Sequence, residues 1–246
     1  MKIIPLSEGS FTIDQTKVFV PFDEESDSLQ QRSRGSLLVE VQPFVVVTDR
    51  DVLLLDTGLG FRTKDGRMQI HQNLIDNGIE PSSITKVLMS HLHKDHSGGV
   101  SYTDENGKVQ LSFPSASYYI RKDELDLALS KDTSSYITKE LECLSGAPQV
   151  KLLEGNGVID DYIRYEVTHA HSQFHQVFWI ESQGKTVFFG GDDAPQMQQM
   201  KSRYVAKYDY DGKKCMELRH KWWKQGGEEH WTFLFYHDIK HATVAL

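Results

Sequence analysis

The most informative segment of the chain is His91-Leu92-His93-Lys94-Asp95-His96. It follows the apolar run 84–89, which predicts a strand, and His91 and His93 are two residues apart, so both imidazoles can project the same way. Asp95 and His96 come after a turn and can face a second ion. Imidazole and carboxylate together suit zinc or a similar first-row divalent ion. The alternative is a solvated histidine-rich loop, which predicts no further ligands at other strand ends.

Further ligand candidates do follow other predicted strands. Asp56 follows the apolar run 52–55, and Gly190-Gly191-Asp192 follows the run 186–189. His237 ends the run 232–236, and three histidines follow the run 163–168: His169, His171 and His175. Apolar strands that deliver carboxylates or imidazoles at their ends build a site along one edge of a layered α/β domain. The repeated pattern favours a metal site over a loop.

The spacing of apolar residues predicts strands followed by helices in the first half of the chain, and the same order again in the second half. The first half is expected to open with strands and to continue with helices at 68–78 and 121–129. The expected strands are 11–22, 36–41, 44–48, 52–55, 84–89, 117–120, 163–168, 176–181, 186–189 and 232–236. Segment 197–227, rich in Lys, Tyr and Asp, is either helix or loop. This order favours sheets packed between helices in one domain.

In this order the segments resemble the metallo-β-lactamase fold superfamily. Its signature is His-x-His-x-Asp-His, followed by a later His, an Asp after a Gly, and a final His. The match runs from Asp56 to His237. The resemblance implies an α/β (α+β) fold, a four-layer αββα sandwich with two mixed sheets between helices, as a single hydrolase domain over residues 1–246.

The resemblance also implies two adjacent metal ions per chain. The two ions are expected to be Zn²⁺, with Fe, Mn or Co as alternatives. His91, His93 and His171 would hold the first ion, and Asp95, His96 and His237 the second. Asp192 would bridge the two ions, and Asp56 would accept a hydrogen bond from a ligand histidine and fix its orientation. Asp95 and Asp192 are also the predicted catalytic residues.

One assignment rests on the choice among three histidines. The family often shows Gly-His-Thr-x-Gly-His at this point, and Ala170-His171-Ser172-Gln173-Phe174-His175 fits it with two substitutions. The fit makes His171 the ligand and places His175 behind the ligands or in a structural role. His169 would then form part of the pocket wall.

The resemblance implies a hydroxide shared by two ions that attacks a carbonyl or phosphoryl centre. The chain is most similar to the branch of N-acyl homoserine lactonases and methyl parathion hydrolase-like enzymes, so opening of a lactone or a related ester is expected. Some lactonases have a Tyr three residues after the bridging Asp, where this chain has Pro195. Tyr204, Tyr208 and Tyr236 are the candidate substitutes. The alternatives are a phosphotriester or thioester hydrolase, and a metal-binding ligand sensor without turnover.

The amino-acid composition indicates which kinds of binding partner and which compartment to expect. The chain has 27 Lys and Arg against 35 Asp and Glu, a formal net charge of −8, which disfavours nucleic-acid binding. The two cysteines, Cys143 and Cys215, have no motif spacing and are expected to be free thiols. The first residues show no apolar stretch long enough for a signal peptide, and no window approaches the length of a membrane span, so a cytoplasmic protein with a small-molecule substrate is expected. A homodimer remains open.

Overall fold

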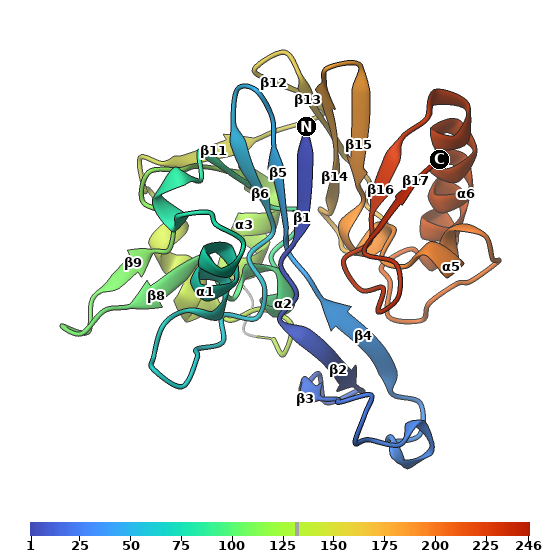
Figure 1. Cartoon of the computed structure of the whole chain (residues 1–246), viewed down its shortest axis with the longest axis horizontal. Helices are drawn as coiled ribbons and strands as arrows, with labels where there is room; N and C mark the ends of the chain where they lie inside the picture. The colour runs from blue at the N-terminus through green and yellow to red at the C-terminus, as the bar shows by residue number, and fades with distance from the viewer. Residues whose placement is uncertain (131–132) are drawn as a thin grey trace.

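The computed structural model describes residues 1–130 and 133–246, and two six-stranded sheets form its centre (Figure 1). The first sheet has the order β1 (Lys2–Pro5), β5 (Phe44–Val47), β6 (Val52–Leu55), β7 (Lys86–Leu88), β10 (Ser117–Arg121) and β11 (Val150–Leu153). The second has the order β12 (Gly157–Ile159), β13 (Ile163–Val167), β14 (Gln176–Ser182), β15 (Lys185–Phe189), β16 (Thr232–Leu234) and β17 (Thr243–Ala245). Both sheets are mixed, because each contains parallel and antiparallel pairs.

The inner core lies between the two sheets and follows from alternation along the strands. On β5 and β6, Phe44 and Leu55 pack in the same cluster as Phe178 and Phe189 of the second sheet. Leu54 points the other way, because successive side chains of a strand face opposite sides. The central strands are apolar on both faces, because both faces are buried. The predicted sandwich of two mixed sheets between helices is confirmed.

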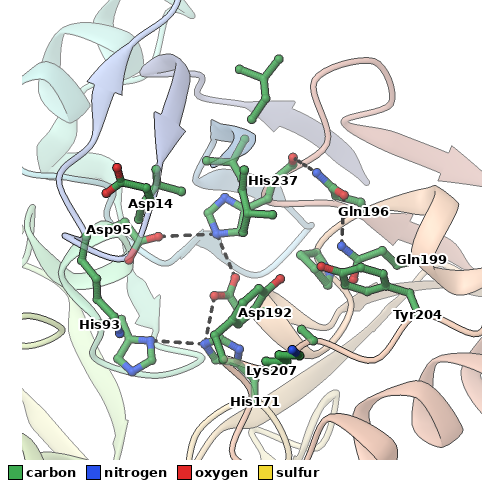
Figure 2. Close-up of a pocket in the computed structure, with 18 of the residues that line it drawn as sticks. Asp14, His93, Asp95, His171, Asp192, Gln196, Gln199, Tyr204, Lys207 and His237 are labelled. Carbon is green, nitrogen blue, oxygen red and sulfur yellow. Dashed lines mark hydrogen bonds and ion pairs between the residues drawn. The ribbon is translucent and has the colours of Figure 1, made fainter. Parts of the chain in front are cut away.

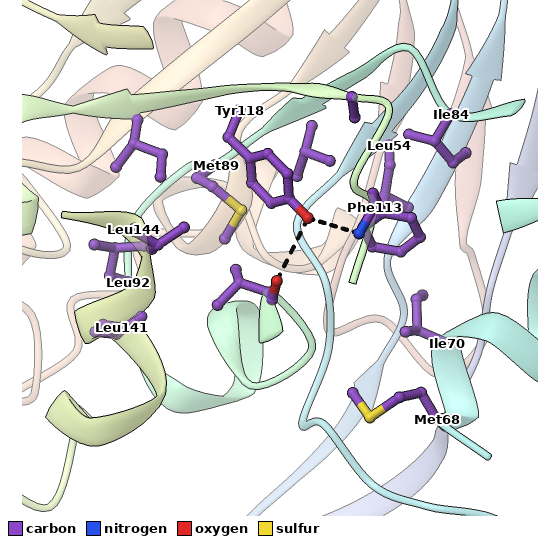
Figure 3. Packing of buried hydrophobic residues seen from close by; sticks show 14 of the residues in the cluster. Leu54, Met68, Ile70, Ile84, Met89, Leu92, Phe113, Tyr118, Leu141 and Leu144 are labelled. Carbon is purple, nitrogen blue, oxygen red and sulfur yellow. Dashed lines mark hydrogen bonds between the residues drawn. The ribbon is translucent and has the colours of Figure 1, made fainter. Parts of the chain in front are cut away.

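The outer face of the first sheet packs against short helices (Figures 1 and 3). These are α1 (Gln69–Asp76), α2 (Lys94–Ser97), α3 (Lys122–Ser130) and α4 (Thr138–Leu141). Ile70 and Leu74 of α1 are four residues apart, share one helix face and are fully buried. The helices predicted at 68–78 and 121–129 are confirmed to within two residues at each end.

The outer face of the second sheet packs against α6 (Gly212–Glu229), with α5 (Met197–Met200) beside it. Aromatic side chains fill this layer: Trp179, Phe188, Trp222, Trp231 and Phe233. Asp211 caps the start of α6, where its side chain accepts a hydrogen bond from Lys214 N at 3.0 Å. Segment 197–227 is therefore a short helix, a connecting loop and most of a long helix.

A three-stranded antiparallel sheet projects from one end of the sandwich (Figure 1). It contains β2 (Gly9–Ile13), β3 (Val20–Pro21) and β4 (Leu37–Val41). The single strand predicted over 11–22 is wrong, because the polar residues after Ile13 turn the chain back and pair Phe11 with Pro21. Smaller elements are the hairpin β8 (Ser101–Thr103) and β9 (Val109–Leu111), and the 3₁₀ turns η1 (Leu29–Gln31), η2 (Pro81–Ser83), η3 (Glu142–Leu144) and η4 (Gly191–Asp193).

Both cysteines are free, as predicted. Within residues 1–130 and 133–246, no helix combines the length and the apolar character needed to cross a membrane. The single domain over residues 1–246 stays a prediction.

Candidate metal centre

The ligand candidates converge because the strands of both sheets end at one edge of the sandwich. In the first sheet, β6 runs into Asp56 and β7 leads to His91. In the second sheet, the loop after β13 carries His171, the turn after β15 carries Asp192, and the chain after β16 reaches His237. All seven predicted ligands therefore lie together, although their sequence positions range from 91 to 237.

The seven side chains form two groups of donor atoms, each within 4.8 Å. The first group contains His91, His93, His171 and Asp192, and the second contains Asp95, His96 and His237. In the first, His171 Nε2 lies 3.3 Å from His93 Nδ1. In the second, Asp95 Oδ2 lies 3.6 Å from His96 Nε2 and 3.5 Å from His237 Nε2. The division is the one that the resemblance implied.

Asp192 lies between the two groups and directs one carboxylate oxygen to each (Figure 2). Its Oδ2 is 3.1 Å from His171 Nε2 and 3.9 Å from His91 Nε2. Its Oδ1 is 3.1 Å from His96 Nε2 and 2.9 Å from His237 Nε2. A carboxylate in this position can bridge two ions.

Asp56 contacts the ligand histidine His96 at the ring nitrogen that does not face the other ligands. Its Oδ2 lies 2.7 Å from His96 Nδ1 and accepts a hydrogen bond from Ser90 Oγ at 2.6 Å, while Oδ1 accepts from Ser90 N at 2.7 Å. Asp56 also falls in a third possible ligand group with His91 and His96. Because its carboxylate already has these three partners, we assign it to orienting His96 and not to binding an ion.

Each of the other ligand histidines except His93 has a comparable partner. His91 Nδ1 lies 3.0 Å from Ser90 Oγ, and His237 Nδ1 lies 2.6 Å from the Glu40 carbonyl oxygen of β4. His171 Nδ1 lies 2.8 Å from Asp209 Oδ1. These contacts leave the opposite ring nitrogen of each imidazole facing the cluster.

Asp209 and a second carboxylate, Asp193, were missed by the sequence analysis. Asp193 is fully buried; its Oδ1 accepts a hydrogen bond from His171 N at 2.7 Å, and its Oδ2 lies 2.9 Å from His175 Nδ1. His175 Nε2 in turn accepts a hydrogen bond from Asp192 N at 3.2 Å. The chain of contacts ties the His171 loop to the Asp192 turn. The only sequence signal was that Asp193 directly follows Asp192.

His169 does not form part of the pocket wall, and that prediction is wrong. It is exposed, adopts a left-handed backbone with φ 51°, and its Nδ1 lies 2.6 Å from the Gln173 carbonyl oxygen. This local contact turns the ring away from the cluster. The neighbouring His171 has a buried side chain that enters the cluster.

Burial and neighbouring charges shift the pKa values of the ligand side chains in both directions. Burial, with help from neighbouring imidazoles, lowers the pKa of His91 and His93 well below the usual range, so both are neutral and able to bind a metal. Burial raises the pKa of the Asp192 carboxyl, but the surrounding imidazoles outweigh it and hold the pKa well below its usual range. The pKa values of three imidazoles are raised, because nearby carboxylates, Asp192 foremost, outweigh burial: His96, His171 and His237.

Unpartnered polar atoms indicate that the donor set fits metal ions. His91 Nε2, His96 Nε2 and Asp192 Oδ1 are buried from solvent and make no well-aligned hydrogen bond within the described residues, although Asp192 Oδ1 lies in close contact with His96 Nε2 and His237 Nε2. Such atoms are costly to bury without a partner. A divalent ion with imidazole and carboxylate ligands satisfies all three.

A cavity of about 860 Å³ opens over this centre (Figure 2). The three-stranded sheet forms its apolar wall with Ile13, Phe19, Leu37, Leu38 and Val39. Opposite lie polar residues of α5 and the following connection, with Gln196, Gln199, Tyr204 and Tyr208 among them. Tyr236 is excluded as a substrate contact, because it is fully buried and its hydroxyl donates to the Asp95 carbonyl oxygen at 2.7 Å.

Comparison with known proteins places these features in a family context. The model of the metallo-beta-lactamase superfamily matches residues 39–204. N-acyl homoserine lactonase AttM of Agrobacterium fabrum is 28% identical over 116 residues, which cover 42% of this chain and 38% of that protein. An N-acyl homoserine lactonase of Bacillus thuringiensis is 28% identical over 106 residues, which cover 43% and 36%. The matched stretch thus spans little more than a third of either relative.

Similar folds extend over nearly the whole chain. A probable metal-dependent hydrolase from Staphylococcus aureus superposes with a TM-score of 0.80 at 24% identity, covering 99% of this chain and 91% of that one. AidC, a dizinc quorum-quenching lactonase solved with a product, superposes with a TM-score of 0.73 at 18% identity, covering 98% and 88%. At these identities the likeness supports the fold.

Proposed function

The chain belongs to the metallo-β-lactamase superfamily, and from this premise we propose that it is a metal-dependent hydrolase that opens a lactone or cleaves a related ester. The observation that carries the proposal is the position of Asp192, whose two oxygens face separate groups of imidazoles. The relatives named as N-acyl homoserine lactonases support the choice of bond. An N-acyl homoserine lactone-like molecule is the favoured substrate.

The residues divide into two ligand sets and a bridge. His91, His93 and His171 would hold one ion, Asp95, His96 and His237 the other, and Asp192 would join them. When bound at these residues, two divalent ions, with zinc favoured by the donor types, would supply a nucleophile from water at neutral pH and would polarise the substrate oxygen.

The chain's own residues bind and orient the substrate. The apolar wall, with Phe19 and Leu37, accommodates a hydrocarbon segment and excludes water from that side of the cavity. Asp95 lines the cavity, while its Oδ2 faces His96 and His237. From this position the carboxylate can accept the proton released by the attacking water and return it to the leaving oxygen.

A substrate panel on zinc-loaded protein tests the proposal. Lactones, aryl esters, thioesters and an aryl phosphotriester are offered, and hydrolysis is followed by proton release or chromophore. We expect lactone or ester turnover, reduced at least about 100-fold in His93→Ala because a ligand is lost. His169→Asn is the matched control, because it changes a histidine that the structure places outside the cluster and should retain activity.

The other outcomes identify the alternatives. Cleavage of the phosphotriester or thioester in place of lactones would show that the protein is a hydrolase that acts on a different bond. Binding of a lactone to the metal-loaded protein without any turnover would contradict the hydrolase and favour a ligand sensor.

A further inference from the structure

We propose that the substrate of this site carries an anionic group, such as a carboxylate, which is bound by three lysines of the cavity: Lys17, Lys94 and Lys207. The inference rests on the proposed function and, among lactones and esters, favours an anionic substrate over a neutral N-acyl homoserine lactone. It concerns residues outside the ligand set.

The three lysines reach one cavity from separate parts of the fold. Lys17 lies in the turn between β2 and β3, Lys94 is the first residue of α2, and Lys207 lies in the connection between α5 and α6. Figure 2 shows Lys207 on the His171 side of the cavity. Lys94 directly follows His93, so cationic side chains flank the ligand cluster on more than one side.

These three ammonium groups have no matching carboxylate nearby. Across residues 1–130 and 133–246, no carboxylate oxygen lies within 4.0 Å of the Nζ of Lys17, Lys94 or Lys207. Lys17 Nζ instead donates to the neutral Ser135 Oγ at 2.6 Å. Lys17 and Lys94 are partly buried and Lys207 is exposed, whereas the largely buried Lys86 pairs with two aspartates.

Three acidic residues also line the cavity. Asp95 and Asp192 belong to the ligand set, and Asp14 is the remaining acid among the described lining residues. Asp14 Oδ1 accepts hydrogen bonds from Thr16 N at 2.9 Å and from Thr16 Oγ1 at 2.6 Å, so its carboxylate closes its own turn. With the carboxylates of Asp95 and Asp192 engaged by the proposed metal ions, the cavity holds three ammonium groups against the one remaining carboxylate of Asp14, in a chain of net charge −8.

Lys17 adopts a left-handed backbone conformation in its turn. Its φ is 57°, in the left-handed region that Gly, Asn and Asp adopt more readily. The turn is closed by Lys17 N, which donates to the Asp14 carbonyl oxygen at 3.0 Å. The hydrogen bond that closes this turn holds Lys17 among the residues that line the cavity.

The cavity therefore selects for an amphiphile. Its apolar wall, formed by residues of β2 and β4 and by Phe19, suits a hydrocarbon segment, and the lysines suit a negative charge on the same molecule. The substrate class that fits is an ester or lactone with an apolar segment and a carboxylate or similar anion apart from the bond that is cleaved.

A binding experiment tests the anion site without turnover. Heptane-1-sulfonate and heptan-1-ol are titrated into zinc-loaded protein at low ionic strength by calorimetry, because a sulfonate is a weak metal ligand. We expect the sulfonate to bind at least about tenfold more tightly than the alcohol, with the difference shrinking as salt screens the charges. The advantage should disappear in Lys17→Gln/Lys94→Gln/Lys207→Gln and persist in Lys221→Gln, which changes an exposed lysine of α6.

Two single substitutions control for misfolding and for loss of the metal ions. Lys17→Gly removes one charge and relieves the left-handed backbone, so the folded state is retained, and sulfonate affinity should fall by about threefold. Zinc content of the Lys94→Gln protein shows whether the adjacent ligands are intact. An equal affinity of wild-type protein for both probes, or a sulfonate preference that survives the triple substitution, would overturn the proposal.

Turnover separates this inference from the proposed function. The ratio of kcat/KM for an aryl ester with a terminal carboxylate to that for its neutral counterpart should fall about tenfold in the triple variant. Sulfonate binding that depends on the lysines, with no ester hydrolysis by wild type, would leave the anion site standing and refute the hydrolase. Hydrolysis with an unchanged ratio would refute the anion site alone.

Discussion

Asp209 Oδ1 lies 2.8 Å from Nδ1 of His171, and the Asp209 side chain is only 1% exposed. The contact directs His171 Nε2 toward Asp192, 3.1 Å away. Two backbone bonds accompany it, because Tyr210 N and Asp211 N donate to the carbonyl oxygens of His171 and Ala170 at 2.9 and 2.7 Å. The loop that lines the cavity is thus anchored to a proposed metal ligand.

Replacing this carboxylate should weaken metal binding. We expect Asp209→Asn to reduce zinc affinity by about 10- to 100-fold, because a neutral amide supports the imidazole less well than a carboxylate. Competition with a chromophoric chelator measures the change. Asp161→Asn, at an exposed position, is the control and should bind zinc as wild type does. Equal affinities for all three proteins would show that Asp209 has no orienting role.

Asp193 should matter for stability as well as for the site. Burial raises the pKa of this carboxyl, but His175 and Thr168 outweigh it and lower the pKa, so the buried group is charged. Asp193→Ala leaves His175 Nδ1 and His171 N without this partner. We expect about 3 kcal/mol less free energy of unfolding in metal-free protein, measured by urea denaturation. A loss below about 1 kcal/mol would contradict this account.

Glu8 predicts an unusual pH dependence of stability. Burial raises the pKa of its carboxyl to about 8, although the bond from Leu59 N at 2.6 Å opposes the shift. Between pH 4.5 and 8 the folded chain retains a proton that the unfolded chain releases, so this group makes stability fall as pH rises through that window. Glu8→Gln cannot ionise and removes the penalty.

The Glu8→Gln protein should therefore gain stability relative to wild type as pH rises from 5 to 9. We expect a gain of about 4 kcal/mol, measured as the difference in free energy of unfolding between the two metal-free proteins. Exposed Glu24→Gln should show no such trend. A wild-type–Glu8→Gln difference that is independent of pH would refute the raised pKa.

Gly99 should tolerate no side chain. A Cβ at this position would lie 2.1 Å from the Thr57 carbonyl oxygen, where α2 packs against the segment after Asp56. We expect Gly99→Ala to lose about 2 kcal/mol or more of stability, together with zinc affinity, since the backbone that positions His96 must shift. Gly227→Ala has open space within α6 and should be stabilising by up to about 1 kcal/mol, as thermal melts of both variants would show.

The sequence made the strand-end ligands predictable, because an apolar run followed by His or Asp marks both an element and its chemistry. His91 and His237 are visible in this way although they are far apart in the chain. Asp209 lay in a segment without periodicity, and only the packing of the loop beside His171 gives it a role. Asp193 was hidden by its neighbour Asp192, since sequence alone does not show which carboxylate enters the cluster.

Local backbone conformation explains the remaining differences between the predicted and the observed structure. The turn at Asp14–Lys17 divides the predicted strand 11–22 into a hairpin, and a left-handed φ turns His169 outward. Neither conformation has a glycine to mark it. The helix boundaries were predictable where amphipathic spacing is strong, as in α1, and not where lysines interrupt it, as in α6.

The central claim is that seven side chains hold two metal ions, and the zinc content of the protein tests it most directly. Elemental analysis after zinc loading and dialysis should find about two ions per chain in wild type and about one in His237→Ala, which removes a ligand of one group alone. Fewer than one ion per chain in the folded wild-type protein would contradict the account.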